Sequence, residues 1–566
     1  MLPAAFISFL AFALALFIGA PACAKDRLYH NGALITLDQG LPSASALLVR
    51  DGRIAAIGES AALLTSAPAT TQRIDLRGRT VIPGLIDSHI HAIRAGLSYA
   101  TEVHWTGAAT IPEALQRLRD AADALPAGGW LIVAGGWTEL QFSERSRPTE
   151  AEIEAAAPNH RIYVQHLYNS ALLSKSAIEA LDLARNGALL AQLKPQNDSG
   201  ELGGWLSGEA EAITALFDLL PRPSLSQQIE GTKAFFRRLN SLGMTGVMDP
   251  GGYNLPLEAY DAVRALARQK QLTLRVIYNL SAPTPGGEFE DFDGLTKDLP
   301  MGAGDGFLRF NGIGENVTWG MYNNERPSVA DKAALARVLG LAAQRRLGVT
   351  FHWMNDRSAG ALLDVLEGVA AQSPIADLRW SIAHLHDATP PTLGRMKKLG
   401  VGWLVQNAFY FRGGAFARQR GEEAARLSPP IVSALDMGLK VAAGTDAHRV
   451  MSFHPFVALQ WMLDGRTVDG QGTRDAREIP TRLQALEAYT LGGAWFSHED
   501  TERGSLMVGK RGDFAVLSDD YMSIPTERIG ALRALMTVVD GRIVYAAAPF
   551  EGLEDPANSL PDESLP

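Results

Sequence analysis

The sequence predicts an α/β protein built around a (β/α)8 TIM barrel, with a large insertion after the first barrel strand and a small β-sandwich domain formed from both chain ends. Two observations carry this prediction. Between residues 83 and 497, short apolar runs alternate with helical stretches, which is the pattern of a parallel sheet with crossover helices. On either side, short apolar runs are joined by Asp-Gly pairs, which is the pattern of β-hairpins.

Eight apolar runs follow one another along the middle of the chain, which is the number that a closed barrel of βα units requires. They cover residues 84–91, 246–250, 274–280, 308–315, 348–353, 380–385, 402–406 and 441–446. The gap between the first two runs is far longer than one helix needs. We therefore expect an insertion at about 105–235, with strands of its own at 130–136 and 161–166.

The hairpin patterns at the two ends predict one shared sheet domain. Asp51-Gly52 separates two apolar runs near the N-terminus, and Asp540-Gly541 does the same near the C-terminus. We expect residues 25–82 and 498–548 to pair into a β-sandwich, although the same patterns also fit two unrelated hairpins. The final segment, 549–566, is rich in Pro, Asp and Glu and is expected to form a flexible tail.

Residues 1–24 have the pattern of a secretory signal peptide. They are uncharged from Leu2 onward, and Ala22-Cys23-Ala24 provides the small residues that a signal peptidase requires. We expect cleavage after Ala24 and export to the periplasm; an uncleaved membrane anchor and a lipidated Cys23 are the alternatives. Cys23 is the only cysteine, so the mature protein would contain neither a disulfide nor a thiol nucleophile.

Composition limits the possible partners. The formal net charge is −10 and the sequence contains no basic tract, which argues against nucleic acid and against a membrane beyond the signal segment. The 46% of hydrophobic and 20% of charged residues are ordinary for a soluble enzyme. A small-molecule substrate is the expected partner, and the composition leaves a homo-oligomer open.

Polar side chains end four of the expected barrel strands, where barrels of this kind place their active sites. His89 and His91 end the first strand and, being two residues apart, project from the same face. His352, His384 and Asp446 end the fifth, sixth and eighth strands. Each alone has an ordinary structural explanation, as a buried histidine or a turn residue. Together they would be costly to bury unpaired, and one divalent-metal site satisfies all of them.

The residues around the first pair resemble a known family. Val81-Ile82-Pro83-Gly84-Leu85-Ile86-Asp87-Ser88-His89-Ile90-His91 is similar to the signature opening of the amidohydrolase superfamily. Gly136-Trp137 and the segments 166–172, 245–252 and 504–513 resemble further parts of its amidohydrolase 3 branch. The resemblance therefore spans nearly the whole mature chain.

The resemblance implies that His89, His91, His352, His384 and Asp446 bind one or two divalent metal ions, with zinc as the expected ion. It implies hydrolysis of a non-peptide C–N bond, in an amide of a small molecule, by metal-activated water. Asp446 would be the catalytic acid–base residue, and His384 would be catalytic, as an electrophile or proton relay in place of a ligand, if the site holds a single metal. Hydrolysis of a lactone or cyclic amide and deamination are alternatives on the same site, and a catalytically silent binding or regulatory protein is the alternative of a different class.

The fourth strand departs from the family's pattern. Many binuclear relatives carry there a carboxylated lysine that bridges two metal ions, but no lysine occurs between Lys297 and Lys332. Gly314 occupies the matching position, and Glu315 is the acidic residue at the end of that strand. Either Glu315 replaces the lysine as a metal ligand, or strand alternation turns it away and the site holds a single metal.

Four residues are candidates for substrate binding. His166 and Asn169, both in the insertion, would supply a hydrogen-bond donor to an oxyanion, unless they serve only in packing. Trp137 belongs to a part of the insertion that resembles the family, and Gln406 ends the seventh strand.

Two further histidines lie close to the expected ligands. His386 and His448 follow His384 and Asp446 by two residues and so share a face with them. They either support the metal site as hydrogen-bonding neighbours of its ligands or are solvated loop residues.

Overall fold

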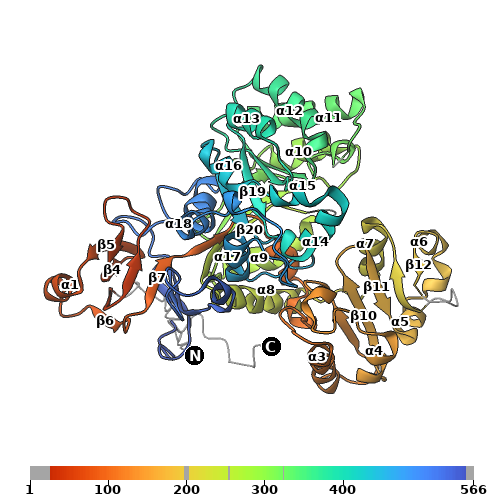
Figure 1. The fold of residues 1–566 in the computed structure, drawn as a ribbon, viewed down its shortest axis with the longest axis horizontal. Helices are drawn as coiled ribbons and strands as arrows, with labels where there is room; N and C mark the ends of the chain where they lie inside the picture. Colours follow the sequence, from red (N-terminus) through yellow and green to blue (C-terminus); the bar gives the residue numbers. More distant parts are fainter. Residues whose placement is uncertain (1–25, 197–202, 253–254, 323, 556–566) are drawn as a thin grey trace, which may run out of the picture.

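A computed structural model describes residues 26–196, 203–252, 255–322 and 324–555, and the signal segment predicted at 1–24 lies outside these described residues. The barrel occupies the middle of the molecule, with a β-rich domain on one side and a mixed α/β unit on the other (Figure 1). No helix among the described residues is long and apolar enough to cross a membrane.

The barrel is a single sheet of eight strands in sequence order, and every neighbouring pair is parallel. Its strands are β8 (Leu85–Asp87), β14 (Met244–Asp249), β15 (Arg275–Leu280), β16 (Leu308–Ile313), β17 (Gly348–Trp353), β18 (Ser381–His384), β19 (Gly402–Gln406) and β20 (Val441–Gly444). All eight overlap the runs predicted from the sequence, so the predicted TIM barrel is confirmed.

Three backbone hydrogen bonds join the first and last strands of the barrel at their carboxyl ends, and one of them runs from the His91 N–H to the Ala447 carbonyl. The Ser88 N–H donates to the Ala443 carbonyl at 3.1 Å, and the Asp446 N–H donates to the His89 carbonyl at 2.8 Å. Strand β8 is shorter than the predicted run, so His89 and His91 lie in the turn beyond it and not on the strand itself. Their shared direction therefore comes from the turn and not from strand alternation.

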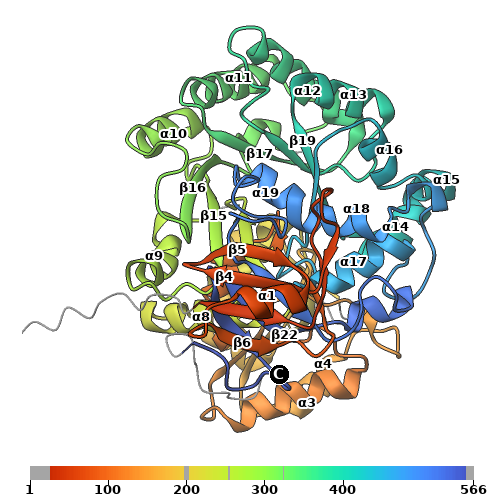
Figure 2. The ribbon, with the colours of Figure 1, turned by 90° about the vertical axis from the view of Figure 1, so that its left-hand side faces the viewer.

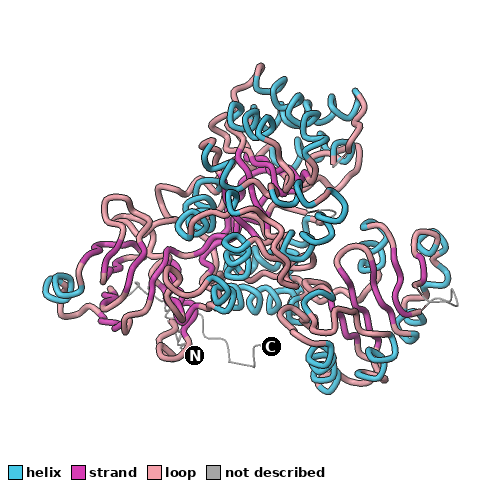
Figure 3. Tube along the Cα trace, viewed as in Figure 1, coloured by secondary structure: helices cyan, strands magenta, loops and turns pink. Residues whose placement is uncertain are grey.

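Helices surround the barrel and are seen around its sheet in Figures 2 and 3. An apolar core fills the space between sheet and helices, with Phe235, Leu339 and Leu363 fully buried in it. The longer helices are α8 (Leu225–Asn240), α9 (Asp261–Arg268), α10 (Glu288–Thr296), α11 (Val329–Gln344), α12 (Asp356–Ala370), α13 (Pro390–Leu399), α14 (Phe409–Arg420) and α17 (Pro455–Asp464). Short helices complete the ring: α2 (Ala92–Gly96), α15 (Glu422–Arg426), α16 (Ile431–Asp436), α18 (Arg482–Glu487) and α19 (Gly493–Phe496).

The insertion forms a separate α/β unit with its own two-sided core. Its mixed sheet has the order β12-β13-β11-β10-β9, and apolar clusters cover both faces. The strands are β9 (Trp130–Val133), β10 (Arg161–His166), β11 (Ser170–Leu173), β12 (Lys194–Pro195) and β13 (Gly204–Ser207). The helices are α3 (Ile111–Asp123), α4 (Glu150–Ala156), α5 (Lys175–Ala180), α6 (Gly187–Leu190) and α7 (Ala210–Asp218).

The boundary expected at residue 235 needs correction, because the insertion ends before α8. The apolar face of this helix, including Phe235 and Leu239, is buried in the barrel core. The prediction assigned α8 to the insertion because it lies in the long gap between the first two barrel strands. Its packing shows that it is the barrel helix that precedes β14.

The β-rich domain is a sandwich of two sheets built from both chain ends. One sheet has the order β5-β4-β1-β6, and the other β23-β22-β21-β7-β2-β3. Their strands are β1 (Arg27–His30), β2 (Ala33–Ile35), β3 (Ser43–Ala44), β4 (Ala46–Arg50), β5 (Arg53–Gly58), β6 (Gln72–Asp75), β7 (Thr80–Pro83), β21 (Phe514–Leu517), β22 (Ala534–Val539) and β23 (Arg542–Ala546), with helix α1 at Ser60–Ser66. A core including Tyr29, Val49 and Phe514 lies between them.

Both predicted hairpins are present in this sandwich. Asp51 and Gly52 connect β4 to β5 with φ of 48° and 75°, and Asp540 and Gly541 connect β22 to β23 with φ of 53° and 73°. Positive φ at both central residues is what a tight hairpin turn requires, and Asp-Gly tolerates it better than most pairs.

The flexible tail expected from residue 549 is wrong for its first part. Phe550 is buried in the sandwich core. The carboxylate of Asp555 lies 2.6 Å from the buried Arg27 guanidinium, and that of Glu554 lies 2.8 Å from Arg237. Composition suggested disorder, but these carboxylates have cationic partners on distant elements. Residues 556–566 lie outside the described part of the chain.

Candidate metal centre

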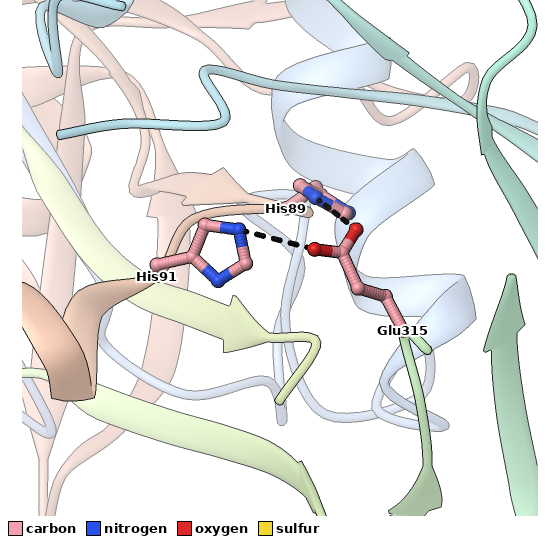
Figure 4. A group of neighbouring side chains, drawn as sticks. All are labelled: His89, His91 and Glu315. Carbon is pink, nitrogen blue, oxygen red and sulfur yellow. Dashed lines mark ion pairs between the residues drawn. The ribbon is translucent and has the colours of Figure 1, made fainter. Parts of the chain in front are cut away.

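Six ligand-type side chains meet at the carboxyl ends of the barrel strands, on the side that faces the insertion. Glu315 lies at their centre, with its carboxylate directed at the two histidines that follow β8 (Figure 4). Its Oε1 lies 3.3 Å from Nε2 of His91, and its Oε2 lies 3.3 Å from Nε2 of His89. Oε2 also lies 3.2 Å from Nδ1 of His352 and 3.6 Å from Nε2 of His384. One carboxylate thus reaches histidines from three strands.

Asp446 closes the other side of the cluster. Its Oδ1 lies 3.5 Å from Nε2 of His89 and 3.3 Å from Nε2 of His91, and its Oδ2 lies 4.0 Å from Nδ1 of His384. The His89 and His384 rings are 5.0 Å apart between centroids. The structure therefore brings together all six residues that the sequence proposed as ligands.

Glu315, and not the preceding residue, provides the side chain at the end of the fourth strand. Gly314 has φ of 151°, and a Cβ there would lie 2.5 Å from the Thr350 carbonyl oxygen. A lysine at this position therefore has no room. The alternative that Glu315 turns toward the barrel wall does not occur in the structure.

Strained backbone conformations hold two of the six residues. His384 and Asp446 have φ of 68° and 57°, values that residues other than glycine seldom adopt. Around His384, the Gln406 side chain accepts from its N–H at 2.8 Å, and the Trp403 indole donates to its carbonyl at 2.8 Å. Gln406, a proposed substrate contact, thus shapes the backbone at the site.

Hydrogen bonds behind the cluster fix the turns that carry the histidines. The Nδ1–H of His91 donates to the Gly251 carbonyl at 2.9 Å, so its Nε2 presents a lone pair to the cluster. Asp249 accepts from Gly251 and from the start of α2. Asp87 accepts from the Thr445 hydroxyl at 2.7 Å, and its burial raises its pKa to about 7. No role was predicted for either aspartate, although both lie within predicted strands and end the observed strands β8 and β14.

The electrostatics keep the two carboxylates ionised. Burial raises the pKa of Asp446, but the close imidazoles of His384, His89 and His91, which are positively charged in acid, more than offset it and leave the pKa well below its usual value. Burial likewise opposes ionisation of Glu315, whereas the surrounding histidines lower its pKa. Burial, aided by His352, lowers the pKa of His384 to about 4, so this imidazole is neutral at pH 7.

The donor set fits a divalent metal ion. Both ring nitrogens of His89 and Nε2 of His384 are buried and make no hydrogen bond of good geometry within the described residues. Three sets of ligand atoms each lie within 4.8 Å of one another: His89, His91 and Glu315; His89, His384 and Asp446; and Glu315, His352 and His384. Imidazole and carboxylate are the ligands that zinc and related ions prefer in a cysteine-free site.

The proposed substrate residues of the insertion lie farther back. Trp137 is fully buried and donates to the Gln165 carbonyl at 2.9 Å. Nε2 of His166 lies 2.7 Å from Glu139, and its Nδ1 lies 3.3 Å from Asn169 Oδ1. These side chains have partners inside the insertion, and no described contact joins them to the six clustered residues.

The insertion nevertheless borders the barrel mouth. The Gly136 N–H donates to the Arg449 carbonyl, in the loop after β20, at 2.7 Å. The Tyr168 hydroxyl lies 3.5 Å from Arg94, which follows His91 in α2. The sequence-based prediction did not include Tyr168 among the residues near the site. Its position between His166 and Asn169, which were proposed, could have indicated it.

His386 and His448 are both buried and are therefore not solvated loop residues. Nε2 of His448 lies 2.7 Å from a Glu102 carboxylate whose side chain is 1% exposed. His386 packs against Phe409, with ring centroids 4.8 Å apart, and neither of its ring nitrogens has a partner among the described residues.

The fold and the site together define a TIM-barrel protein with a cluster of histidine and carboxylate side chains, suited to bind metal, at the barrel mouth. Residues 72–545 match the amidohydrolase family, and the chain belongs to that family. The sequence-based prediction of an enzyme that hydrolyses carbon–nitrogen bonds other than peptide bonds is confirmed at the level of this family.

Two similar proteins cover nearly the whole chain. N-substituted formamide deformylase of Arthrobacter pascens is 27% identical over 92% of this chain and 98% of its own length. Protein LONG AFTER FAR-RED 3 of Arabidopsis thaliana is 26% identical over 92% of this chain and 91% of its own length.

Solved structures share the fold. An uncharacterized metal-dependent hydrolase from Pyrococcus horikoshii superposes with a TM-score of 0.64 at 20% identity, covering 89% of this chain and 99% of its own. Guanine deaminase of E. coli superposes with a TM-score of 0.51 at 15% identity, covering 92% of this chain and 99% of its own.

Proposed function

We propose that this protein hydrolyses a non-peptide amide bond of a small molecule at a binuclear divalent-metal centre, with zinc as the expected ion. The observation that carries the proposal is the position of Glu315, whose Oε2 lies near His89, His352 and His384 and whose Oε1 lies near His91. A carboxylate among these histidines is suited to bridge two ions. The relative named for formamide deformylation supports an amide as the substrate.

The residues of the cluster divide the chemistry between them. When bound, a divalent ion supplies Lewis acidity, which lowers the pKa of water toward about 7 and polarises a carbonyl group. Asp446 accepts the proton of the attacking water, because its carboxylate is ionised and 16% exposed toward the mouth. It then delivers that proton to the departing nitrogen. The neutral His384 lies beside it, with Nδ1 4.0 Å from Oδ2 of Asp446.

The test combines metal analysis with a substrate panel. Elemental analysis of the purified full-length protein is expected to give about two equivalents of divalent metal. Activity is measured on formamides, acetamides, lactones and ring amines. Asp446→Asn is expected to lower kcat by about 10²- to 10⁴-fold, which is the usual contribution of a general acid–base residue. Asp261→Asn, an exposed site on the outer helix α9, is the matched control and should keep full activity.

Each outcome separates the proposal from its alternatives. If the protein hydrolyses lactones or ring amines but no amides, the proposed amide substrate is wrong and one of these classes takes its place. A protein that hydrolyses nothing after zinc or manganese has been added, and that retains no metal on dialysis, would overturn the proposal in favour of a catalytically silent relative.

A further inference from the structure

A cationic side chain stands at the mouth of the barrel without a described partner. Arg412 belongs to α14, which begins directly after β19 and lies between the barrel and the insertion (Figure 1). Its side chain is exposed to solvent. Among the described residues, its guanidinium makes no hydrogen bond or ion pair. Burial nevertheless lowers its pKa, and the charge that opposes this effect is Asp446. The charge of Arg412 thus acts on Asp446 and also on His386, which places the guanidinium near both groups.

The helix directs Arg412 toward that cluster. Phe409 packs on the His386 ring at 4.8 Å, and His386 lies 6.0 Å from the His384 ring. Residues three apart on a helix share a face, so Arg412 projects from the same side of α14 as Phe409. Arg418, nine residues beyond Phe409, projects from the opposite side.

Unsatisfied polar groups line the same part of the mouth. His386 is 2% exposed and Asn407 is 1% exposed, and neither has a hydrogen-bond partner for any side-chain nitrogen or oxygen among the described residues. His386 lies two residues after β18, and Asn407 directly follows the neighbouring strand β19. Buried amides and imidazoles are normally hydrogen-bonded, and their donors together with a free guanidinium suit an acceptor-rich, anionic group.

We propose that Arg412, with His386 and Asn407 beside it, binds a carboxylate of the substrate, so that the natural substrate is an amide that carries a free carboxylate near the scissile bond. This inference rests on the proposed amide hydrolysis and adds the charge of its substrate. The guanidinium fork pairs with a carboxylate through two parallel hydrogen bonds, which fixes the substrate's orientation at the cluster. Arg412 is a specificity-determining residue and takes no part in proton transfer.

The experiment compares matched substrates that differ only in charge. N-Formyl and N-acetyl amino acids are tested beside their C-terminal carboxamides, on the wild type and on Arg412→Gln. We expect the wild type to prefer the carboxylates. In Arg412→Gln, the ratio of kcat/KM for carboxylate over carboxamide should fall by about 10- to 100-fold, mainly through KM, as for the loss of a charged hydrogen bond. Arg412→Lys should recover part of that ratio, and Arg418→Gln should leave it unchanged.

A binding measurement keeps the two proposals distinguishable. Calorimetric titration of the metal-loaded protein with the same N-acyl amino acids and carboxamides gives their affinities without turnover. An enzyme that hydrolyses both members of a pair equally, or an Arg412→Gln variant that loses both equally, would overturn the carboxylate site while leaving amide hydrolysis intact. If no amide is hydrolysed, the proposed function fails, and unchanged carboxylate affinity in Arg412→Gln would then refute the carboxylate site as well.

Discussion

One buried ion pair joins the barrel to the sandwich and gives a quantitative test of the fold. Arg275, at the start of β15, places Nε 2.7 Å and Nη2 3.1 Å from the two oxygens of Asp513, just before β21. Both side chains are 2% exposed. Arg275 also donates to the Gly306 carbonyl at 2.6 Å and to Asp540 at 2.9 Å.

Arg275→Met removes the guanidinium while keeping most of the side-chain volume. Asp513 is then a buried carboxylate without its cation, a change that typically costs about 3–5 kcal/mol. The contact with Asp540 adds little, because that carboxylate is 30% exposed and keeps its pairing with Arg511 at 2.9 Å. Arg395→Met, which breaks a pair with Glu367 whose side chains are 30% and 48% exposed, is the control and should cost about 0–1 kcal/mol.

Urea denaturation followed by tryptophan fluorescence measures both variants at pH 7, and Asp513→Asn in the Arg275→Met background should recover part of the loss.

The pH dependence of this stability difference has a defined sign. Burial raises the pKa of Asp513, but Arg275 outweighs it and lowers the pKa. Without Arg275 that pKa rises, so acidification from pH 7 toward about 4 should narrow the gap between wild type and Arg275→Met. Equal midpoints for Arg275→Met and Arg395→Met, or no recovery in the double variant, would refute the reasoning.

Three further predictions concern the site and its surroundings. Glu315→Gln should lower the metal content by elemental analysis from about two equivalents to one, because a neutral amide is a poor bridge; an unchanged content places Glu315 outside the metal shell. Gly314→Ala should weaken metal retention during dialysis against a chelator, because its Cβ would meet the Thr350 carbonyl; retention equal to that of wild type contradicts the lack of space. Burial raises the pKa of Glu102, but His448 lowers it to about 2, so this carboxylate stabilises the fold above about pH 4.3 and loses that effect as the pH falls toward 2. Glu102→Gln should therefore reduce the free energy of unfolding by about 3 kcal/mol at pH 7, with the difference shrinking in acid; a constant difference across this range refutes the assignment.

The sequence was sufficient to predict the barrel strands and the cluster, for a physical reason. Each proposed ligand lies at the carboxyl end of a predicted strand, and the carboxyl ends of parallel strands meet on one side of a barrel. His352, His384 and Asp446 could therefore be grouped without knowledge of the helices between them. The hairpins at Asp51 and Asp540 were equally local, since the turn type depends on the pair of residues itself.

Other features depend on packing that no local pattern expresses. The lack of room for a side chain at Gly314 comes from the Thr350 carbonyl on the neighbouring strand, and it leaves Glu315 to supply the side chain at this strand end. The segment around Asp555 is held in place by the ion pair between Asp555 and Arg27, which is far away in the sequence. Arg412 lies in an ordinary helical stretch, and its position at the mouth follows only from the contact between Phe409 and His386.

The hydrogen bond from the Asp446 N–H to the His89 carbonyl has a consequence for how the protein matures. Two of the candidate metal ligands belong to the residues whose backbones seal the barrel, and more than 350 positions of chain separate them. A nascent chain that has not yet docked β20 against β8 has incomplete coordination, so it cannot capture metal tightly while it is still being made. The complete cluster therefore forms only when the barrel closes, and molecules that have not closed it are expected to hold metal less tightly.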